Sequence, residues 1–188
     1  MVAALYAMKV PLPRDAFPRR IETARLLLRH PEKGEAARYA RHAQEAYATR
    51  PEPLLHDQAR AFAAFMLGHW YRYGFGFLVI DVAGAVDRGM SVGHVGLKYL
   101  DAWPNHWPEN YDAIELGYSM IPGARGRGYV TEAARAVLAA AFAAFDVPSI
   151  CAKCNHDNSK SAAVLLRCGM TELEATQRVR RFEIVRPG

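Results

Sequence analysis

The fold is decided by residues 115–133, which read ELGYSMIPGARGRGYVTEA. The pattern predicts a strand over residues 113–120 and a helix over residues 129–145. The loop between them contains glycines at positions 123, 126 and 128. Glycine lets the backbone approach a ligand closely and turn its amides inward. The sequence therefore predicts a ligand-binding turn between a strand and a helix.

The ligand expected at this loop carries phosphate. The start of the helix supplies free N–H groups and the positive end of a dipole, which favour a pyrophosphate. Arg125 and Arg127 place fixed positive charge beside it. The loop is neither a nucleotide P-loop, since no Gly-Lys-Ser/Thr follows, nor a dinucleotide G-x-G-x-x-G turn. A basic turn capped by glycine has the same spacing, so spacing alone leaves both interpretations open.

Upstream of the loop, the sequence predicts three strands and two helices. The strands are expected at residues 25–29, 75–82 and 91–100, the last two as a hairpin. A first helix is predicted over residues 32–47 and a second one up to Gly74. The second helix has an apolar stripe at helical spacing, formed by Phe62, Phe65, Met66, His69 and Trp70.

Downstream of the loop, the long helix is expected to bury Val130, Ala134, Val137, Leu138, Ala141 and Phe145. A strand follows over residues 149–155, then a helix with Asn158 as its N-cap and Gly169 just past its end. Strands near residues 171–176 and 181–185 complete the order. The first twenty residues, with three prolines, are interpreted as a lead-in outside the core, and residues 21–188 as one α/β (α+β) domain.

Composition restricts the class of protein. A chain of 188 residues has the size of one domain, and its net charge of +5 fits either simple solubility or a phosphate-rich partner. The three cysteines cannot all pair with one another, which indicates a reducing, cytoplasmic location. No segment is long enough to cross a bilayer. Cys151 and Cys154 lie three apart on a predicted strand and point to opposite faces, so no metal site is expected.

Two ordered motifs resemble those of the GNAT acetyltransferase superfamily. The Arg125-Gly-Arg-Gly-Tyr129 turn, followed by Thr-Glu-Ala-Ala, resembles the family's coenzyme A motif, although Gly123 stands at its first basic position. Residues 155–170 resemble the family's N-x-x-S helix ending in Gly-Phe, with Met170 in place of Phe. The Arg-Leu-x-Leu-Arg opening at 25–29 is similar to the branch of ribosomal-protein N-terminal acetyltransferases. The likeness extends over residues 21–186.

This resemblance implies a mostly antiparallel mixed sheet of about seven strands flanked by about four helices. It also implies acetyl-CoA as co-substrate, with direct attack by a primary amine in a ternary complex and no metal. The amides of residues 124–129 are expected to hold the pyrophosphate. The cofactor contacts implied by the motifs are Tyr118, Met120, Ile121, Arg125, Gly126, Arg127, Gly128, Tyr129, Asn158 and Ser161.

Candidate catalytic residues follow from their places in the motifs. Glu115, on the strand before the loop, is the first candidate for general base, with a solvated strand residue or a structural ion pair as the alternatives. His94 is the second candidate, although a lone strand histidine is more often merely packed or exposed. The Met120 N–H is expected to stabilise the oxyanion. Leu165 stands where relatives place a tyrosine acid, so Ser161, or a water that it holds, is expected to protonate the thiolate.

The acceptor is expected to be a protein N-terminus or a small-molecule amine. Its pocket is predicted from residues 47–55, the Trp103–Trp107 loop and the turn at residues 178–181. A non-catalytic acyl-CoA-binding module is the alternative function. A nucleic-acid-binding domain is a distant third, because no basic run of five residues occurs. The protein is expected to be a monomer or homodimer that binds neither nucleic acid nor membrane.

Overall fold

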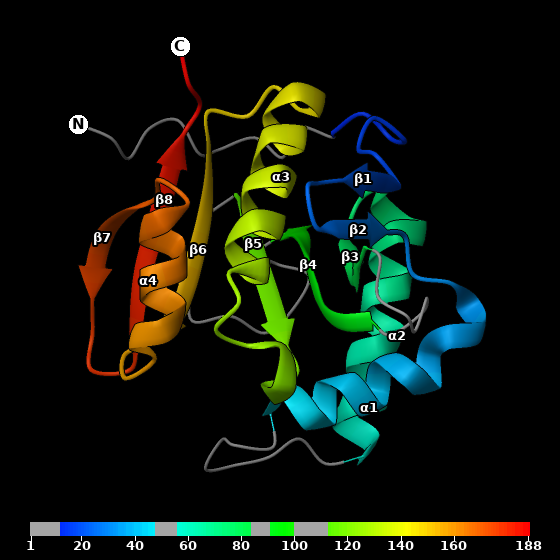
Figure 1. The fold of residues 1–188 in the computed structure, drawn as a ribbon. Helices are drawn as coiled ribbons and strands as arrows, with labels where there is room; N and C mark the ends of the chain where they lie inside the picture. The colour runs from blue at the N-terminus through cyan, green and yellow to red at the C-terminus, as the bar shows by residue number, and fades with distance from the viewer. Residues whose placement is uncertain (1–11, 48–55, 84–90, 100–112) are drawn as a thin grey trace.

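A computed structural model describes residues 12–47, 56–83, 91–99 and 113–188, which form one eight-stranded sheet with helices on both faces (Figure 1). The strand order is β1-β2-β3-β4-β5-β6-β8-β7. Every neighbouring pair is antiparallel except β5 and β6. The strands are β1 (Arg20–Glu22), β2 (Leu26–Arg29), β3 (Phe77–Val82), β4 (Ser91–Tyr99), β5 (Ile114–Met120), β6 (Ser149–Asn155), β7 (Thr171–Ala175) and β8 (Val179–Val185).

Four α-helices connect these strands. They are α1 (Ala36–Tyr47), α2 (His56–Tyr73), α3 (Tyr129–Ala144) and α4 (Ser159–Arg167). The mixed, mostly antiparallel sheet and the four helices are confirmed, and β1 makes the sheet one strand wider than expected. The first helix begins with a short 3-10 turn, η1 (Lys33–Glu35), so its α-helical part starts later than predicted. None of the helices in the described ranges has the length and apolarity of a membrane span.

The two faces of the sheet bury different kinds of side chain. In Figure 1, α3 and α4 lie in front of the sheet and α2 lies behind it. The front face is mainly apolar, and α3 buries Ala133, Ala134, Val137, Leu138 and Ala141 there, whereas Val130, which the sequence predicts to be buried, is only partly buried. The rear face packs Val79 against α1 and α2. The strand registers place His94, Lys98 and Glu115 on that same rear face. Among the described residues, the buried histidine, lysine and glutamate of β4 and β5 therefore lie together on the rear face.

The segment that precedes β1 belongs to the core, which corrects the expectation that residues 1–20 lie outside it. Leu12 and Phe17 are buried, and the Phe17 ring lies 5.9 Å from the Trp70 ring and 5.8 Å from the Phe145 ring. The prolines keep this segment irregular, but burial of a large aromatic side chain holds it against the ends of α2 and α3. The first eleven residues lie outside the described part of the chain.

Candidate functional site

The loop between β5 and α3 has the geometry of an anion site. It starts with a 3-10 turn, η3 (Pro122–Ala124). Gly126 and Gly128 then take φ values of +79° and +78°, which side chains with a Cβ rarely adopt. Left-handed residues that alternate with ordinary ones turn successive N–H groups into one concavity, which binds anions. Backbone conformation therefore forms a concavity at the loop for which the sequence predicts a phosphate ligand.

Not every amide of this loop is available to a ligand. Ala124 donates its N–H to Ile121 O at 3.1 Å, and Arg125 donates its N–H to Pro122 O at 3.2 Å. This corrects the expectation that amides 124–129 act together, because the turn uses the first two. Within the described residues, no turn or cap hydrogen bond uses the N–H groups of residues 126–129. These four groups precede or begin α3, where the helix dipole adds partial positive charge.

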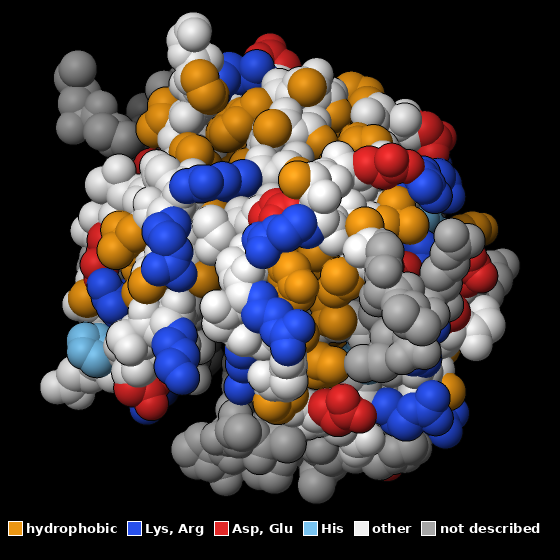
Figure 2. Space-filling model, in the orientation of Figure 1, with side chains coloured by type: hydrophobic (Ala, Val, Ile, Leu, Met, Phe, Trp, Pro, Cys, Tyr) orange, Lys and Arg blue, Asp and Glu red, His pale blue; other side chains and the backbone are white. Residues whose placement is uncertain are grey.

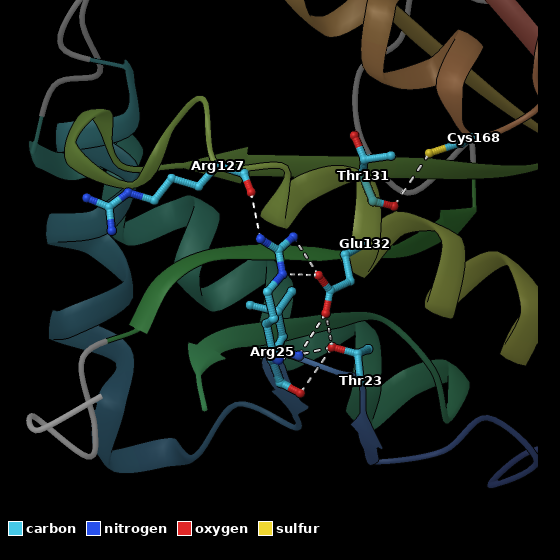
Figure 3. Close-up of polar contacts among 7 residues, drawn as sticks. Thr23, Arg25, Arg127, Thr131, Glu132 and Cys168 are labelled. Carbon is cyan, nitrogen blue, oxygen red and sulfur yellow. Dashed lines mark hydrogen bonds and ion pairs between the residues drawn. The ribbon is translucent and has the colours of Figure 1, made fainter. Parts of the chain in front are cut away.

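The two predicted arginines of the loop point to different places. Arg125 donates its Nε–H to Met120 O at 3.0 Å, which holds its guanidinium beside the end of β5. Arg127 is exposed, and its side chain extends away from α3 in Figure 3. Figure 2 shows Lys and Arg side chains gathered on the face that α3 and α4 cover. This positive charge lies on the same side of the sheet as the loop.

Next to the loop, β5 and β6 are joined at one position. Their register contains the single pair Glu115–Cys151. On the other edge of β5, Ile121 donates to Val92 O at 3.0 Å, and Met120 stands opposite Gly93. Hydrogen-bonded and non-bonded pairs alternate in an antiparallel ladder, so the N–H groups of Met120 and Tyr118 face β6 rather than β4. Backbone N–H donors therefore line the edge of β5 that faces β6, where a single residue pair joins the two strands.

The N-terminus of α4 approaches the same region. Asn158 is the N-cap of this helix, as predicted, and its Oδ1 accepts from the Ser161 N–H at 3.1 Å. Tyr118 reaches from β5 to α4, where its hydroxyl lies 2.8 Å from Ser161 Oγ and donates to Ser161 O at 3.0 Å. Burial raises the pKa of Tyr118 well above its usual value, so the phenol stays protonated. Leu165, at the position where relatives place a tyrosine, is buried. The hydroxyl beside Ser161 comes from Tyr118.

Glu115 lies on the opposite face of the sheet from Tyr118. Its side chain is buried, and its Oε2 accepts from Lys98 Nζ at 2.7 Å. Lys98 is directly opposite Glu115 in the β4–β5 register. The ion pair considered as an alternative for Glu115 is therefore present.

His94 is packed inside the rear face. Its ring lies 5.1 Å from the Phe62 ring of α2 and 5.6 Å from the Phe77 ring of β3. Complete burial, together with repulsion from His42, lowers the pKa of His94 to about 3. The imidazole is therefore neutral at physiological pH and a weak proton acceptor. The packed histidine considered as the alternative is what the structure contains.

A polar network beside the loop was not predicted from the sequence. Thr23 and Arg25, in the turn between β1 and β2, bind Glu132 in the first turn of α3 (Figure 3). Arg25 also donates to the carbonyl of Arg127 at 2.9 Å. Arg25 belongs to the Arg-Leu-x-Leu-Arg opening noted in the sequence, but Glu132, which it binds, lies 107 residues away. A cavity of about 490 Å³ adjoins this network; its lining is Thr23, Arg25, Gly128, Thr131, Glu132, Arg135 and Arg167.

The predicted acceptor region is only partly described. Residues 48–55 and the Trp103–Trp107 loop lie outside the described ranges. The turn at residues 178–181 contributes Arg178 and Val179 to a second cavity of about 450 Å³. The three cysteines are free and buried, and the described residues contain no cluster of three or more His, Cys, Asp or Glu suited to a metal.

Comparison with protein families matches residues 25–171 to the Acetyltransferase (GNAT) domain. Among solved structures, an acetyltransferase from Agrobacterium tumefaciens has 26% identity and a TM-score of 0.67, covering 88% of this chain and 93% of that chain. A ribosomal L7/L12 alpha-N-protein acetyltransferase in complex with coenzyme A has 16% identity and a TM-score of 0.68, covering 88% and 97%. The ribosomal-protein-S5-alanine acetyltransferase from Vibrio fischeri has 16% identity and a TM-score of 0.64, covering 89% and 96%. No curated protein sequence matches significantly.

Proposed function

Because the chain belongs to the GNAT acetyltransferases, we propose that it moves the acetyl group of acetyl-CoA to a primary amine in a ternary complex. The observation that carries this proposal is the concavity formed at Gly126 and Gly128 at the start of α3. Four N–H groups, a helix dipole and nearby arginines suit a pyrophosphate. A neutral ligand would gain little from such an arrangement.

The chemistry requires a neutral amine, a stabilised oxyanion and a proton for the leaving thiolate. We infer that the Met120 N–H, which faces the open side of β5, stabilises the oxyanion that forms on the thioester carbonyl. As the C–S bond breaks, the CoA thiolate takes a proton from Ser161 or from a water that it holds. Tyr118 is hydrogen-bonded to Ser161 Oγ and stays protonated, so its hydroxyl replaces the proton that Ser161 gives up.

Glu115 remains our first candidate for the base, and His94 the second. A histidine whose pKa is about 3 accepts a proton poorly near pH 7, which favours the carboxylate. Glu115 lies on the face opposite Tyr118, so base and acid would approach the reaction from different sides of the sheet. Glu115→Gln should lower turnover while leaving the Kd for acetyl-CoA nearly unchanged. Equal turnover in the two proteins would remove Glu115 from the mechanism.

We further propose a protein N-terminus, or alternatively a small-molecule amine, as acceptor, and the reducing cytoplasm as location. The names of two solved structures with this fold, both ribosomal-protein acetyltransferases, suggest the first acceptor class. The three free cysteines support the location. The residues of the phosphate loop proposed to contact the co-substrate are Arg125, Gly126, Arg127, Gly128 and Tyr129, with Tyr118, Met120, Ile121, Asn158 and Ser161 along the rest of its path.

Calorimetric titration with acetyl-CoA tests the co-substrate. Gly126→Glu places a strained residue and a negative charge in the phosphate loop, so binding should be lost. Gly68→Glu, in open space on α2, is the matched control and should bind as the native protein does. Native protein that binds no acyl-CoA would contradict the proposal.

A panel of amine acceptors, followed by release of CoA thiol, separates the enzyme from the alternative. Turnover with a ribosomal-protein N-terminal peptide or with a small amine would identify the acceptor class. Tight acetyl-CoA binding without turnover on any acceptor would instead favour a non-catalytic acyl-CoA-binding module.

A further inference from the structure

Arg25 makes an unusual number of contacts with the segment that carries the phosphate loop. Its Nε–H donates to Glu132 Oε2 at 2.7 Å, and its Nη2 lies 2.7 Å from the same oxygen. Its Nη1–H donates to Arg127 O at 2.9 Å, and its guanidinium lies 4.9 Å from the centre of the Tyr129 ring. Figure 3 shows the guanidinium between the Arg127 carbonyl and the Glu132 carboxylate. One side chain from the turn between β1 and β2 thus contacts the loop at Arg127 and the first turn of α3 at Tyr129 and Glu132.

The bond to Arg127 O has a consequence for the next amide. A trans peptide is planar, and its C=O and N–H point in opposite directions. A carbonyl of Arg127 that points toward Arg25 therefore directs the N–H of Gly128 away from Arg25. Gly128 has a φ of +78°, so no Cβ restricts the rotation of this peptide plane. Some other group must fix the orientation, and Arg25 is the group that binds it.

Glu132 keeps Arg25 in place. Its Oε1 accepts from the Thr23 hydroxyl at 2.7 Å and from the Arg25 N–H at 2.9 Å, while Oε2 takes the guanidinium. The side chain of Glu132 is about one-fifth exposed, and that of Arg25 about one-half. The turn between β1 and β2 is thereby fastened to the first turn of α3. A carboxylate at that position would repel a phosphate if Arg25 did not neutralise it.

We propose that Arg25 is a positioning residue for the pyrophosphate, which holds the Arg127 carbonyl so that the Gly128 N–H faces the ligand. Arg25 acts through the peptide plane, because each nitrogen of its guanidinium already binds Glu132 or Arg127. This inference rests on the proposed function, since the pyrophosphate is that of acetyl-CoA. It gives the Arg-Leu-x-Leu-Arg opening a role in co-substrate binding.

Calorimetry and steady-state kinetics of Arg25→Met test the inference, both in the native chain and in Glu132→Gln, where no unpaired Glu132 carboxylate remains to repel the phosphate. The Kd and the KM for acetyl-CoA should rise about tenfold, the loss of one well-aligned charge-assisted donor, while kcat at saturating acetyl-CoA stays unchanged. Arg20→Met is the matched control, because Arg20 is exposed and binds only Glu22 across the described residues. It should bind acetyl-CoA as the native protein does.

Glu132→Gln separates positioning from mere stiffening of the helix start. The glutamine oxygen still accepts a hydrogen bond, and Arg25 keeps its bond to Arg127 O, so the Kd for acetyl-CoA should rise much less than in Arg25→Met. If Glu132→Gln weakens binding as much as Arg25→Met does, the ion pair and not the carbonyl contact is responsible, and the inference fails.

Acetyl-CoA binding by the native protein distinguishes failure of the proposed function from failure of this inference. Native protein that does not bind acetyl-CoA would overturn the proposed function and this inference with it. Native protein that binds, with an unchanged Kd in a folded Arg25→Met, would overturn this inference alone. Circular dichroism and the thermal midpoint of each variant report whether it is folded.

Discussion

The Lys98–Glu115 and Arg25–Glu132 ion pairs have the same N···O distance of 2.7 Å but different surroundings. The first pair lies on the rear face of the sheet, where its side chains are 11% and 7% exposed. The second lies at the start of α3, where its side chains are 48% and 19% exposed. When a buried charge loses its partner, no water takes the partner's place. Water does solvate an exposed charge that loses its partner. The comparison teaches that burial, more than distance, sets what each pair contributes.

Breaking the buried pair should have the largest effect on stability. Lys98→Met leaves the Glu115 carboxylate buried without the cation that binds it, which should lower the free energy of unfolding by about 3 kcal/mol or more. Urea denaturation at pH 7 measures the loss. The double variant Lys98→Met/Glu115→Leu removes both charges and should recover part of the stability. A loss below about 1 kcal/mol in the single variant would show that water enters this face.

The buried histidine of the same face should have the next largest effect, and it depends on pH. The pKa of His94 falls from 6.5 to about 3 on folding, so the unfolded chain binds more protons between these values. Stability is fully present above pH 6.5 and is lost as the pH falls. At pH 5 the His94 share of the loss is about 2 kcal/mol.

The variant His94→Gln isolates that share. Burial also lowers the pKa values of His30 and His42, so the native protein loses stability in acid through several groups. The difference in unfolding free energy between pH 7 and pH 5 should be smaller in His94→Gln than in the native protein. His156→Gln, at an exposed site, is the control and should retain the native difference. Equal acid sensitivity in His94→Gln would mean that the ring is solvated.

On the front face, a neutral polar contact should matter less. Tyr118→Phe removes the hydroxyl that binds Ser161, which should lower the free energy of unfolding by about 1 kcal/mol. Denaturation of the variant, followed by tryptophan fluorescence, measures this change. A change as large as that of Lys98→Met would remove the distinction between the two faces.

The half-exposed ion pair should have the smallest effect. Glu132→Gln should lower the free energy of unfolding by roughly 0.5 kcal/mol, because water and salt screen a pair of this exposure. Denaturation in low salt and in 1 M salt checks the origin of the effect, which should shrink at high salt. A loss that is large and independent of salt would place this pair in the same class as Lys98–Glu115.

Local patterns in the sequence were sufficient to predict most of the fold. The stripe of α2, the buried residues of α3 and the Asn158 cap follow from helical spacing and N-cap chemistry. The glycines at 126 and 128 predicted the sharp turn between β5 and α3, because few other residues adopt a positive φ. Within the loop, however, the sequence did not reveal that the 3-10 turn uses the amides of Ala124 and Arg125.

Contacts between distant segments could not be predicted in the same way. Alternation along β5 gives the face on which Glu115 lies, but only the β4–β5 register brings Lys98 opposite it. Arg25 and Glu132 are each polar residues in amphipathic elements, and nothing local distinguishes them from solvated side chains. Phe17 lies between prolines and lacks any periodic context, so its burial follows from the tertiary packing alone.

Because a single residue pair joins β5 and β6, the sheet has a weak seam between these two strands. Five strands lie on one side of this seam and three on the other, and few backbone hydrogen bonds cross it. Helices α3 and α4 and the Tyr118–Ser161 contact must therefore hold the two halves together. In hydrogen exchange, the amides of Tyr118 and Met120 should lose protection before those of Gly117 and Ser119, which face β4. A molecule seated in the seam would join the halves, so its binding should raise the temperature at which they separate.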